Sequence, residues 1–172
     1  MRIGHGYDSH RFEAGRPLIL GGVEIPSERG LRGHSDADAV AHAVTDAVLG
    51  AAGLGDIGSH FPDSEDGWKD ADSLGLLARA IHLLEGENYQ VVNVDVTVIA
   101  EHPRIGPHAA EMSRRLAAAL GIAPDHVSVK GKSNEGMGWI GREEGIAVFA
   151  VALIDRMEDQ ALLFARHGRP GG

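Results

Sequence analysis

The hydrophobic and polar positions along the chain follow two different periods, and together they predict a mixed α+β fold. Residues 93–99 alternate between polar and apolar side chains, as a half-buried strand does. Residues 39–54 instead repeat apolar side chains at helical spacing. Residues 145–153 are nearly all apolar, so both faces of this strand are expected to be covered, either by helices or at a subunit contact. The predicted strands are 2–10, 18–25, 89–100, 126–132 and 145–154, and the predicted helices are 37–54, 73–85 and 107–120.

The predicted helices have typical start and stop residues. Ser35 followed by Asp38 resembles a capping box at the start of the first helix, and Gly53 and Gly55 end it. Pro107 suits the first turn of the last helix, and Gly121 suits its C-terminal cap. Between the elements, residues 59–72 are polar and acidic and are expected to form a mobile loop.

Composition limits the class of protein. The chain has 172 residues, enough to bury one core, which is expected to be aliphatic because hydrophobic residues make up 43% and aromatic residues 5%. The lack of cysteine excludes disulfides and thiolate metal sites. No signal peptide or membrane-length apolar run is present in the sequence, so a cytoplasmic protein without a membrane partner is expected. The net charge of −9 argues against binding to nucleic acid.

Three residues near the N-terminus form a candidate metal site. Asp8 and His10 are two residues apart on a predicted strand, so they point to the same face. Gly4 and Gly6 lie on that face too and leave room for a bulky neighbour. With His42 they supply one carboxylate and two imidazoles, the ligand set of a catalytic zinc or manganese ion that keeps one position open. The alternative is an edge strand that ends in polar residues.

His42 lies on a helix face between two carboxylates. Asp38 precedes it by four residues and Asp46 follows it by four. A histidine that binds a metal usually donates its second ring nitrogen to a carboxylate or carbonyl, so Asp38 and Asp46 are candidates for this role. The alternative is a solvated stripe of polar residues.

Two loops could bind a ligand. Residues 55–63 are rich in glycine, and Asp56 and Asp63 could accept hydrogen bonds from hydroxyl groups, although such residues also form ordinary turns. Residues 130–136 combine small residues, hydroxyls, amides and lysines that suit a phosphate cradle, and Glu135 could hold magnesium. The Walker spacing is absent, and an ordinary loop is the alternative.

Several motifs in order along the chain resemble those of the 2-C-methyl-D-erythritol 2,4-cyclodiphosphate synthase family. The matching segments are 2–10, 33–38 with His42, 55–58, 61–63, 93–95 and 141–147. The resemblance runs from residue 1 to about residue 155, which predicts one synthase domain over 1–155. Residues 156–172 lie outside it and are expected to form a partly disordered tail.

The resemblance implies an enzyme of the non-mevalonate isoprenoid pathway, classed as a phosphorus–oxygen lyase. The 2-phosphate of 4-diphosphocytidyl-2-C-methyl-D-erythritol 2-phosphate attacks the β-phosphorus, and CMP leaves as the cyclic diphosphate forms. The implied fold is ferredoxin-like, a mixed sheet with helices on one face. The implied assembly is a homotrimer with active sites between subunits and an axial channel that an isoprenoid diphosphate occupies in some members.

The resemblance also implies roles for individual residues. Zn²⁺ is expected at Asp8, His10 and His42, and Mg²⁺ or Mn²⁺ at Glu135. His34 and Ser133 are the expected stabilisers of the transition state. The expected substrate-binding residues are Ser35, Asp56, Gly58, Phe61, Asp63, Ala100, Pro103, Arg104, Ile105, Gly106, Lys132, Asn134, Trp139 and Arg142.

The chain departs from the family pattern in the loop that carries Glu135. Ser133 keeps a hydroxyl where threonine is common, and Lys132 replaces a small polar residue, which suggests that Lys132 neutralises part of the α-phosphate charge. Trp139 replaces a common phenylalanine. Two other functions fit the same residues: a metal-dependent phosphohydrolase that transfers the phosphoryl group to water, and a trimeric binding protein for isoprenoid diphosphates without turnover.

Overall fold

The strands of the protein form one mixed sheet and a small separate hairpin. The computed structural model describes residues 1–33, 35–62 and 72–157. Within them, a five-stranded sheet has the order β4-β1-β7-β5-β6, in which β5 and β6 are parallel and the other neighbours are antiparallel. Its strands are β1 (Arg2–Ala14), β4 (Arg29–Leu31), β5 (Tyr89–Ile99), β6 (Val127–Lys132) and β7 (Gly145–Arg156). The hairpin consists of β2 (Leu18–Leu20) and β3 (Val23–Ile25).

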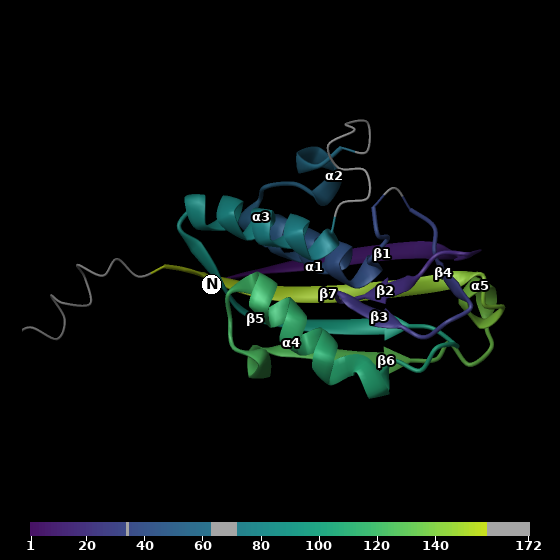
Figure 1. Cartoon of the computed structure of the whole chain (residues 1–172). Helices are drawn as coiled ribbons and strands as arrows, with labels where there is room; N and C mark the ends of the chain where they lie inside the picture. Colours follow the sequence, from purple (N-terminus) through teal and green to yellow (C-terminus); the bar gives the residue numbers. More distant parts are fainter. Residues whose placement is uncertain (34, 63–71, 158–172) are drawn as a thin grey trace, which may run out of the picture.

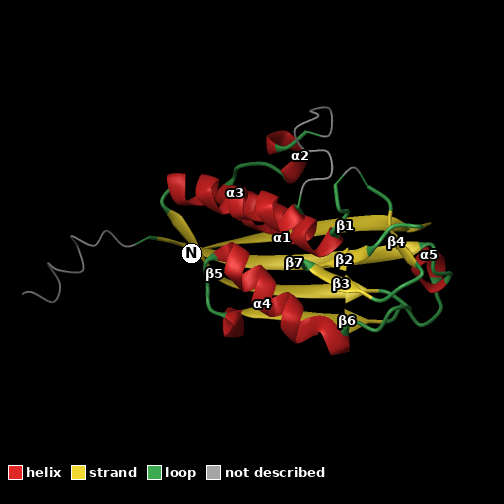
Figure 2. Cartoon of the chain, viewed as in Figure 1, coloured by secondary structure: helices red, strands yellow, loops and turns green. Residues whose placement is uncertain are grey.

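Three longer helices cover one face of the sheet. They are α1 (Ala39–Ala52), α3 (Ser73–Gly86) and α4 (Ala109–Leu120), and Figures 1 and 2 show all three on the same side. Two single-turn helices, α2 (Ile57–His60) and α5 (Gly138–Gly141), and two 3₁₀ turns, at Gly106–His108 and Pro124–His126, complete the described elements. The arrangement confirms the predicted mixed α+β layer with helices on one face.

The central strand β7 explains the apolar run near the C-terminus. Its alternate residues Ile146, Val148, Ala150, Ala152 and Ile154 are buried beneath the helices. Their neighbours Phe149 and Val151 point to the other face, where Val151 keeps 43% of its surface exposed. In the described part of the chain, the helices therefore cover one of the two apolar faces and leave the other uncovered.

The structure corrects several predicted boundaries. The predicted strand 18–25 is a hairpin, because Gly21 and Gly22 adopt positive φ angles of 56° and 72° and turn the chain. Strand β4 was not predicted, since three residues carry too short a pattern. Pro107 lies in a 3₁₀ turn, and the last helix begins at Ala109. Most of the predicted loop 59–72 and nearly all of the predicted tail 156–172 lie outside the described residues.

The predicted capping box at α1 is wrong, because Asp38 itself caps the helix. Its carboxylate accepts hydrogen bonds from the backbone N–H groups of Val40 and Ala41, and from those of Gly21 and Gly22 in the hairpin turn. One buried carboxylate thus joins the β2–β3 hairpin to the start of α1. The predicted helix ends at Gly53 and Gly121 are confirmed, with φ angles of 79° and 70°.

Strand β1 packs directly on helix α1 because it carries glycine at the contact. A Cβ atom on Gly4 would lie 1.9 Å from the carbonyl oxygen of Ala47, and one on Gly6 would lie 1.9 Å from that of Ala43. The bulky neighbour that these glycines accommodate is therefore the backbone of α1. This close approach brings the middle of β1, which carries Asp8 and His10, next to the first turns of the helix.

Candidate metal centre and substrate pockets

The three predicted metal ligands converge in the structure. Asp8 and His10 extend from β1, and His42 extends from the first turn of α1. Asp8 Oδ2 lies 3.0 Å from Nε2 of His10 and 3.1 Å from Nδ1 of His42. One ligand atom from each residue lies within 4.8 Å of the other two, so the group could hold a metal ion.

The electrostatics of this group favour a charged Asp8. Burial alone would raise the pKa of Asp8, but hydrogen bonds from His10 and His42 outweigh it and hold the pKa well below its usual range. Burial is the largest single influence on His10 and disfavours its protonation, yet the hydrogen bond to Asp8, the negative charge of Asp8 and the contact with the Arg32 carbonyl together outweigh burial and raise the pKa of His10. A carboxylate that stays ionised beside two imidazoles fits a divalent cation.

The far ring nitrogens of both histidines have their own partners. Nδ1 of His10 lies 2.7 Å from the carbonyl oxygen of Arg32. Nε2 of His42 lies 3.0 Å from Oγ of Ser73 and 3.3 Å from Oγ of Ser35. The nitrogens that face Asp8 are thus the ones that a metal could bind, and the donor set suits a divalent metal ion.

The carboxylates predicted to support His42 are engaged elsewhere. Asp38 caps α1, and Asp46 accepts a hydrogen bond from the backbone N–H of Ile57 at 2.8 Å. The partner of His42 is Ser73, the first residue of α3, which is 31 positions further along the chain. No local pattern in the sequence links these two residues.

A cavity of about 400 Å³ opens beside the three ligands and collects several predicted residues. Its lining residues are Asp8, His10, Gly33, Ser35, His42, Ile57, Gly58, Phe61, Pro62 and Leu76. Asp56 caps α2 instead, where its carboxylate accepts from the backbone N–H and the hydroxyl of Ser59. The predicted residues His34 and Asp63 lie outside the described residues.

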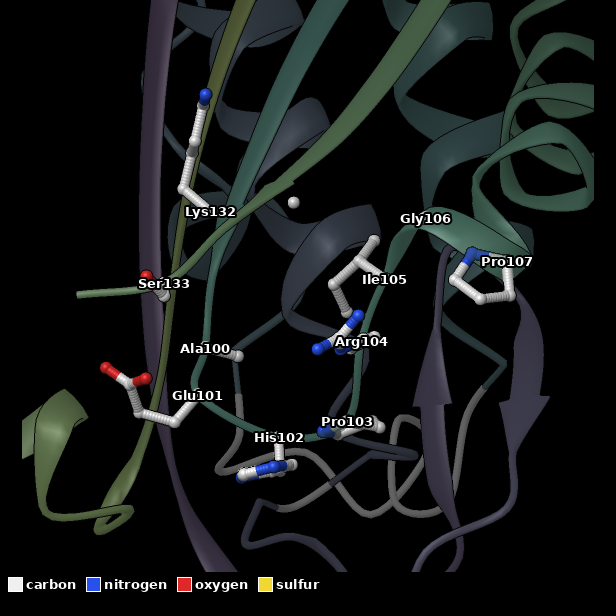
Figure 3. Close-up of a pocket in the computed structure, with 11 residues that line it drawn as sticks. Ala100, Glu101, His102, Pro103, Arg104, Ile105, Gly106, Pro107, Lys132 and Ser133 are labelled. Carbon is white, nitrogen blue, oxygen red and sulfur yellow. The ribbon is translucent and has the colours of Figure 1, made fainter. Parts of the chain in front are cut away.

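A second cavity of about 630 Å³ lies between the 100–107 loop and the end of β6 (Figure 3). It collects the predicted nucleotide-side residues Ala100, Pro103, Arg104, Ile105, Gly106, Lys132 and Ser133. In Figure 3 the amino group of Lys132 extends away from Glu101 and Ser133. The cavity is bordered by backbone, the Ser133 hydroxyl, the basic side chains of Arg104 and Lys132 and the Glu101 carboxylate, and the basic groups suit an anionic ligand.

Glu101 organises the loop that carries Ser133 and Glu135. Its Oε1 accepts hydrogen bonds from the backbone N–H groups of Asn134 and Gly136, at 3.0 and 3.1 Å. The Ser133 hydroxyl donates to Oε1 of Glu135 at 2.9 Å, and the Asn134 side chain donates to the carbonyl oxygen of Met137. Sequence reasoning missed Glu101, since it acts across a distance of 33 positions.

The two cavities belong to different parts of the sheet. The metal ligands lie on β1 and α1, whereas Ser133 and Glu135 follow β6, and strands β7 and β5 separate β1 from β6.

Trp139 lines a third cavity of about 440 Å³ with Ser9, His10, Arg11 and Glu144. Arg142 donates to the carboxylate of Glu144 at 2.8 Å.

Among the described residues, no helix has the length and apolar character needed to cross a membrane.

Comparisons with known proteins agree on one family. The YgbB family profile matches residues 1–155. The 2-C-methyl-D-erythritol 2,4-cyclodiphosphate synthase of Symbiobacterium thermophilum is 60% identical over 154 residues, which cover 90% of this chain and 98% of that protein. A solved synthase structure in a CDP-bound form is 38% identical with a TM-score of 0.82, and the match covers 90% of this chain and 100% of that one. The bifunctional IspDF of Campylobacter jejuni gives a TM-score of 0.88 at 38% identity, and the match covers 91% of this chain but only 42% of that chain.

Proposed function

The chain belongs to the YgbB family, and we infer from this membership that it catalyses the cyclisation for which its synthase relatives are named. It converts 4-diphosphocytidyl-2-C-methyl-D-erythritol 2-phosphate to 2-C-methyl-D-erythritol 2,4-cyclodiphosphate and CMP. It is therefore a phosphorus–oxygen lyase of the non-mevalonate isoprenoid pathway. The observation that carries this conclusion is the 60% identity over nearly the full length of a named synthase, together with the convergence of Asp8, His10 and His42.

The proposed site acts in two ways: it positions the substrate and it neutralises the negative charge of its phosphate groups. Asp8, His10 and His42 hold a zinc ion, and Glu135 holds magnesium or manganese. A zinc ion held there would polarise the phosphoryl group under attack, and a second ion held by Glu135 would neutralise charge on the diphosphate. His34 and Ser133 donate hydrogen bonds to phosphoryl oxygens as charge develops on them. Because nucleophile and electrophile belong to one molecule, holding the substrate in a folded shape supplies much of the acceleration.

The remaining proposed substrate contacts follow the two cavities. Ser35, Gly58 and Phe61 border the metal-side cavity. Asp56 and Asp63 are the proposed partners of the erythritol hydroxyl groups. The 100–107 loop and Lys132 border the other cavity, where the cytidine diphosphate part binds, in keeping with the CDP-bound form of a solved relative. Asn134, Trp139 and Arg142 complete the proposed substrate contacts.

The bare face of the sheet supports the proposal of a homotrimer built from this ferredoxin-like layer. Ile3, Tyr7, Phe149 and Val151 point away from the helices, and Ile3 and Tyr7 keep 72% and 47% of their surfaces exposed. Such an apolar face is typical of an obligate subunit contact. Within one chain, the Glu135 loop and the three metal ligands lie at separate strands of the sheet. A neighbouring subunit would bring its own Glu135 loop to these ligands.

Three further proposals concern a ligand in the axial channel of the trimer, the extent of the domain and the location of the protein in the cell. We place an isoprenoid diphosphate in the axial channel beside Trp139 and Arg142, and failure of geranyl or farnesyl diphosphate to bind the trimer would contradict this. Residues 1–155 form the single synthase domain, and the tail 156–172 has no assigned role. The acidic, cysteine-free composition supports a cytoplasmic location, which fractionation of the producing cells would test.

Phosphorus NMR tests the reaction directly. The purified protein with the cytidine diphosphate substrate, zinc and magnesium is expected to give two coupled cyclic-diphosphate signals together with CMP. Hydrolysed products without the cycle would favour a phosphohydrolase, and intact substrate would favour a binding protein. Either result would contradict the proposed function. The same experiment with the His42→Ala variant is expected to show no turnover, because this variant lacks a ligand of the metal that catalysis requires.

Replacement of Lys132 tests the nucleotide side. Lys132→Ala is expected to raise KM about tenfold and to change kcat less, because the lost charge weakens binding of the α-phosphate before and during reaction. Steady-state kinetics of CMP release measures both constants. Lys130→Ala is the matched control, since Lys130 lies on the same strand and pairs with Asp95. Unchanged turnover and affinity in Lys132→Ala would show that Lys132 takes no part.

A further inference from the structure

We propose that Ser73 and Asp36 position His42 for metal binding through a hydrogen-bonded chain from the imidazole to the carboxylate. The proposal rests on the metal site in the proposed function, and it adds two positioning residues from outside the ligand set. Ser73 is the first residue of α3 and is fully buried, with 0% of its surface exposed. Asp36 lies in the segment that leads into α1. The chain thus links the start of one helix to a ligand on another.

The direction of each hydrogen bond follows from the chemistry of the partners. An ionised carboxylate can only accept, so the Ser73 hydroxyl donates its one proton to Oδ1 of Asp36. The lone pairs of that hydroxyl remain, and they accept from Nε2 of His42 at 3.0 Å. Nε2 therefore keeps the ring proton when His42 binds a metal, and the lone pair for the metal is on Nδ1, the nitrogen that faces Asp8 at 3.1 Å.

The Asp36 carboxylate is itself held in place. It accepts from the backbone N–H of Ser73 through Oδ2 at 3.1 Å, and from the backbone N–H of Asp38 through Oδ1 at 3.1 Å. These donors leave the carboxylate little freedom to rotate. The Ser35 hydroxyl lies further from Nε2, at 3.3 Å, and also accepts from the backbone N–H of Ala37. Ser73 is therefore the better acceptor for the His42 proton.

The two histidines of the site are fixed by different means. Nδ1 of His10 faces the backbone carbonyl of Arg32, an acceptor that no substitution removes. His42 instead depends on side chains, so its tautomer and ring orientation can be changed by mutation. Partners of this kind commonly change metal affinity by about 10- to 100-fold when they are removed.

Zinc affinity of the full-length protein tests the proposal. Ser73→Ala is expected to weaken zinc binding about 10- to 100-fold in competition with a chromophoric chelator, and to alter the visible spectrum of the cobalt(II)-loaded protein. Asp36→Asn keeps one acceptor oxygen but places an NH₂ group against a backbone or hydroxyl donor, so a smaller loss is expected. Thr45→Val is the matched control, because it also removes a buried hydroxyl, in this case one on α1 that donates to the carbonyl oxygen of Ala41.

The outcomes separate this inference from the proposed function. If the unmodified protein binds no zinc, the metal site itself fails, and the inference fails with it. If the unmodified protein binds zinc and Ser73→Ala binds it equally well with the same cobalt spectrum, only the inference is overturned. An equal loss in Thr45→Val would also overturn it, because the effect would then be general loosening of α1. If Ser73→Ala does not fold, Asp36→Asn decides: weaker zinc binding in this variant supports the inference, and unchanged zinc binding overturns it.

Discussion

Asp8→Ala is expected to lower turnover by roughly a thousandfold or more, equivalent to about 4 kcal/mol of transition-state stabilisation. Asp8 is the only carboxylate among the three converging ligands, and its Oδ2 faces both imidazoles. Without it, two neutral histidines remain, and they hold a divalent cation weakly. The variant should also copurify with little zinc. CMP release and metal content by mass spectrometry measure the two effects.

An aspartate outside the site provides the control for this variant. Asp95→Ala removes an exposed carboxylate from β5 that pairs with Lys130, and it is expected to leave turnover unchanged. Circular dichroism shows whether Asp8→Ala keeps its fold. A folded Asp8→Ala protein that turns over at a rate near that of the unmodified chain would show that the three residues are not the catalytic metal site.

The same variant tests whether each site is shared between subunits. Asp8→Ala and Glu135→Gln are each expected to be inactive alone, because each lacks one proposed metal ligand. In trimers reassembled from an equal mixture, about one quarter of the sites would combine an intact Asp8 from one subunit with an intact Glu135 from its neighbour. Partial recovery of turnover after mixing supports the shared site. No recovery would place Asp8 and Glu135 of one site on the same chain.

The sequence predicted most of the elements and the candidate metal ligands, because each of these depends largely on short-range periodicity. Asp8 and His10 share a face because a strand repeats every two residues, and His42 lies on a helix with clear apolar spacing. That the two elements meet is a tertiary result, which the sequence signalled only through Gly4 and Gly6. Roles at the individual positions came from the family resemblance rather than from spacing.

The residues that were missed act over long distances or replace an expected partner. Ser73 and Glu101 bond across 31 and 33 positions, and no local pattern marks such pairs. Asp38 was expected beside His42, but its carboxylate turns to four backbone N–H groups, because a helix start and a hairpin turn both leave donors without partners there. The sequence predicts a continuous strand where the structure has the hairpin at Gly21, since the apolar pattern continues through the turn.

Gly6→Ala is expected to lower the free energy of unfolding by about 3 kcal/mol or more and to weaken zinc binding at the same time. The added Cβ would lie 1.9 Å from the carbonyl oxygen of Ala43 and 2.9 Å from the backbone nitrogen of Ala47, and neither backbone atom can move without moving α1. Strand and helix must therefore separate. Asp8 and His10 are on the strand and His42 is on the helix, so the separation also pulls the ligands apart.

Chemical denaturation and chelator competition measure the two effects of Gly6→Ala, and the helix itself supplies the control. Gly50 lies on α1 with nothing within 4 Å of an added Cβ, so Gly50→Ala should leave zinc affinity unchanged and stabilise the helix by up to about 1 kcal/mol. Loss in the first variant without loss in the second assigns the effect to the strand–helix contact rather than to glycine content. If Gly6→Ala has the same free energy of unfolding and the same zinc affinity as the unmodified chain, then the close contact of β1 with α1 does not hold the metal ligands together.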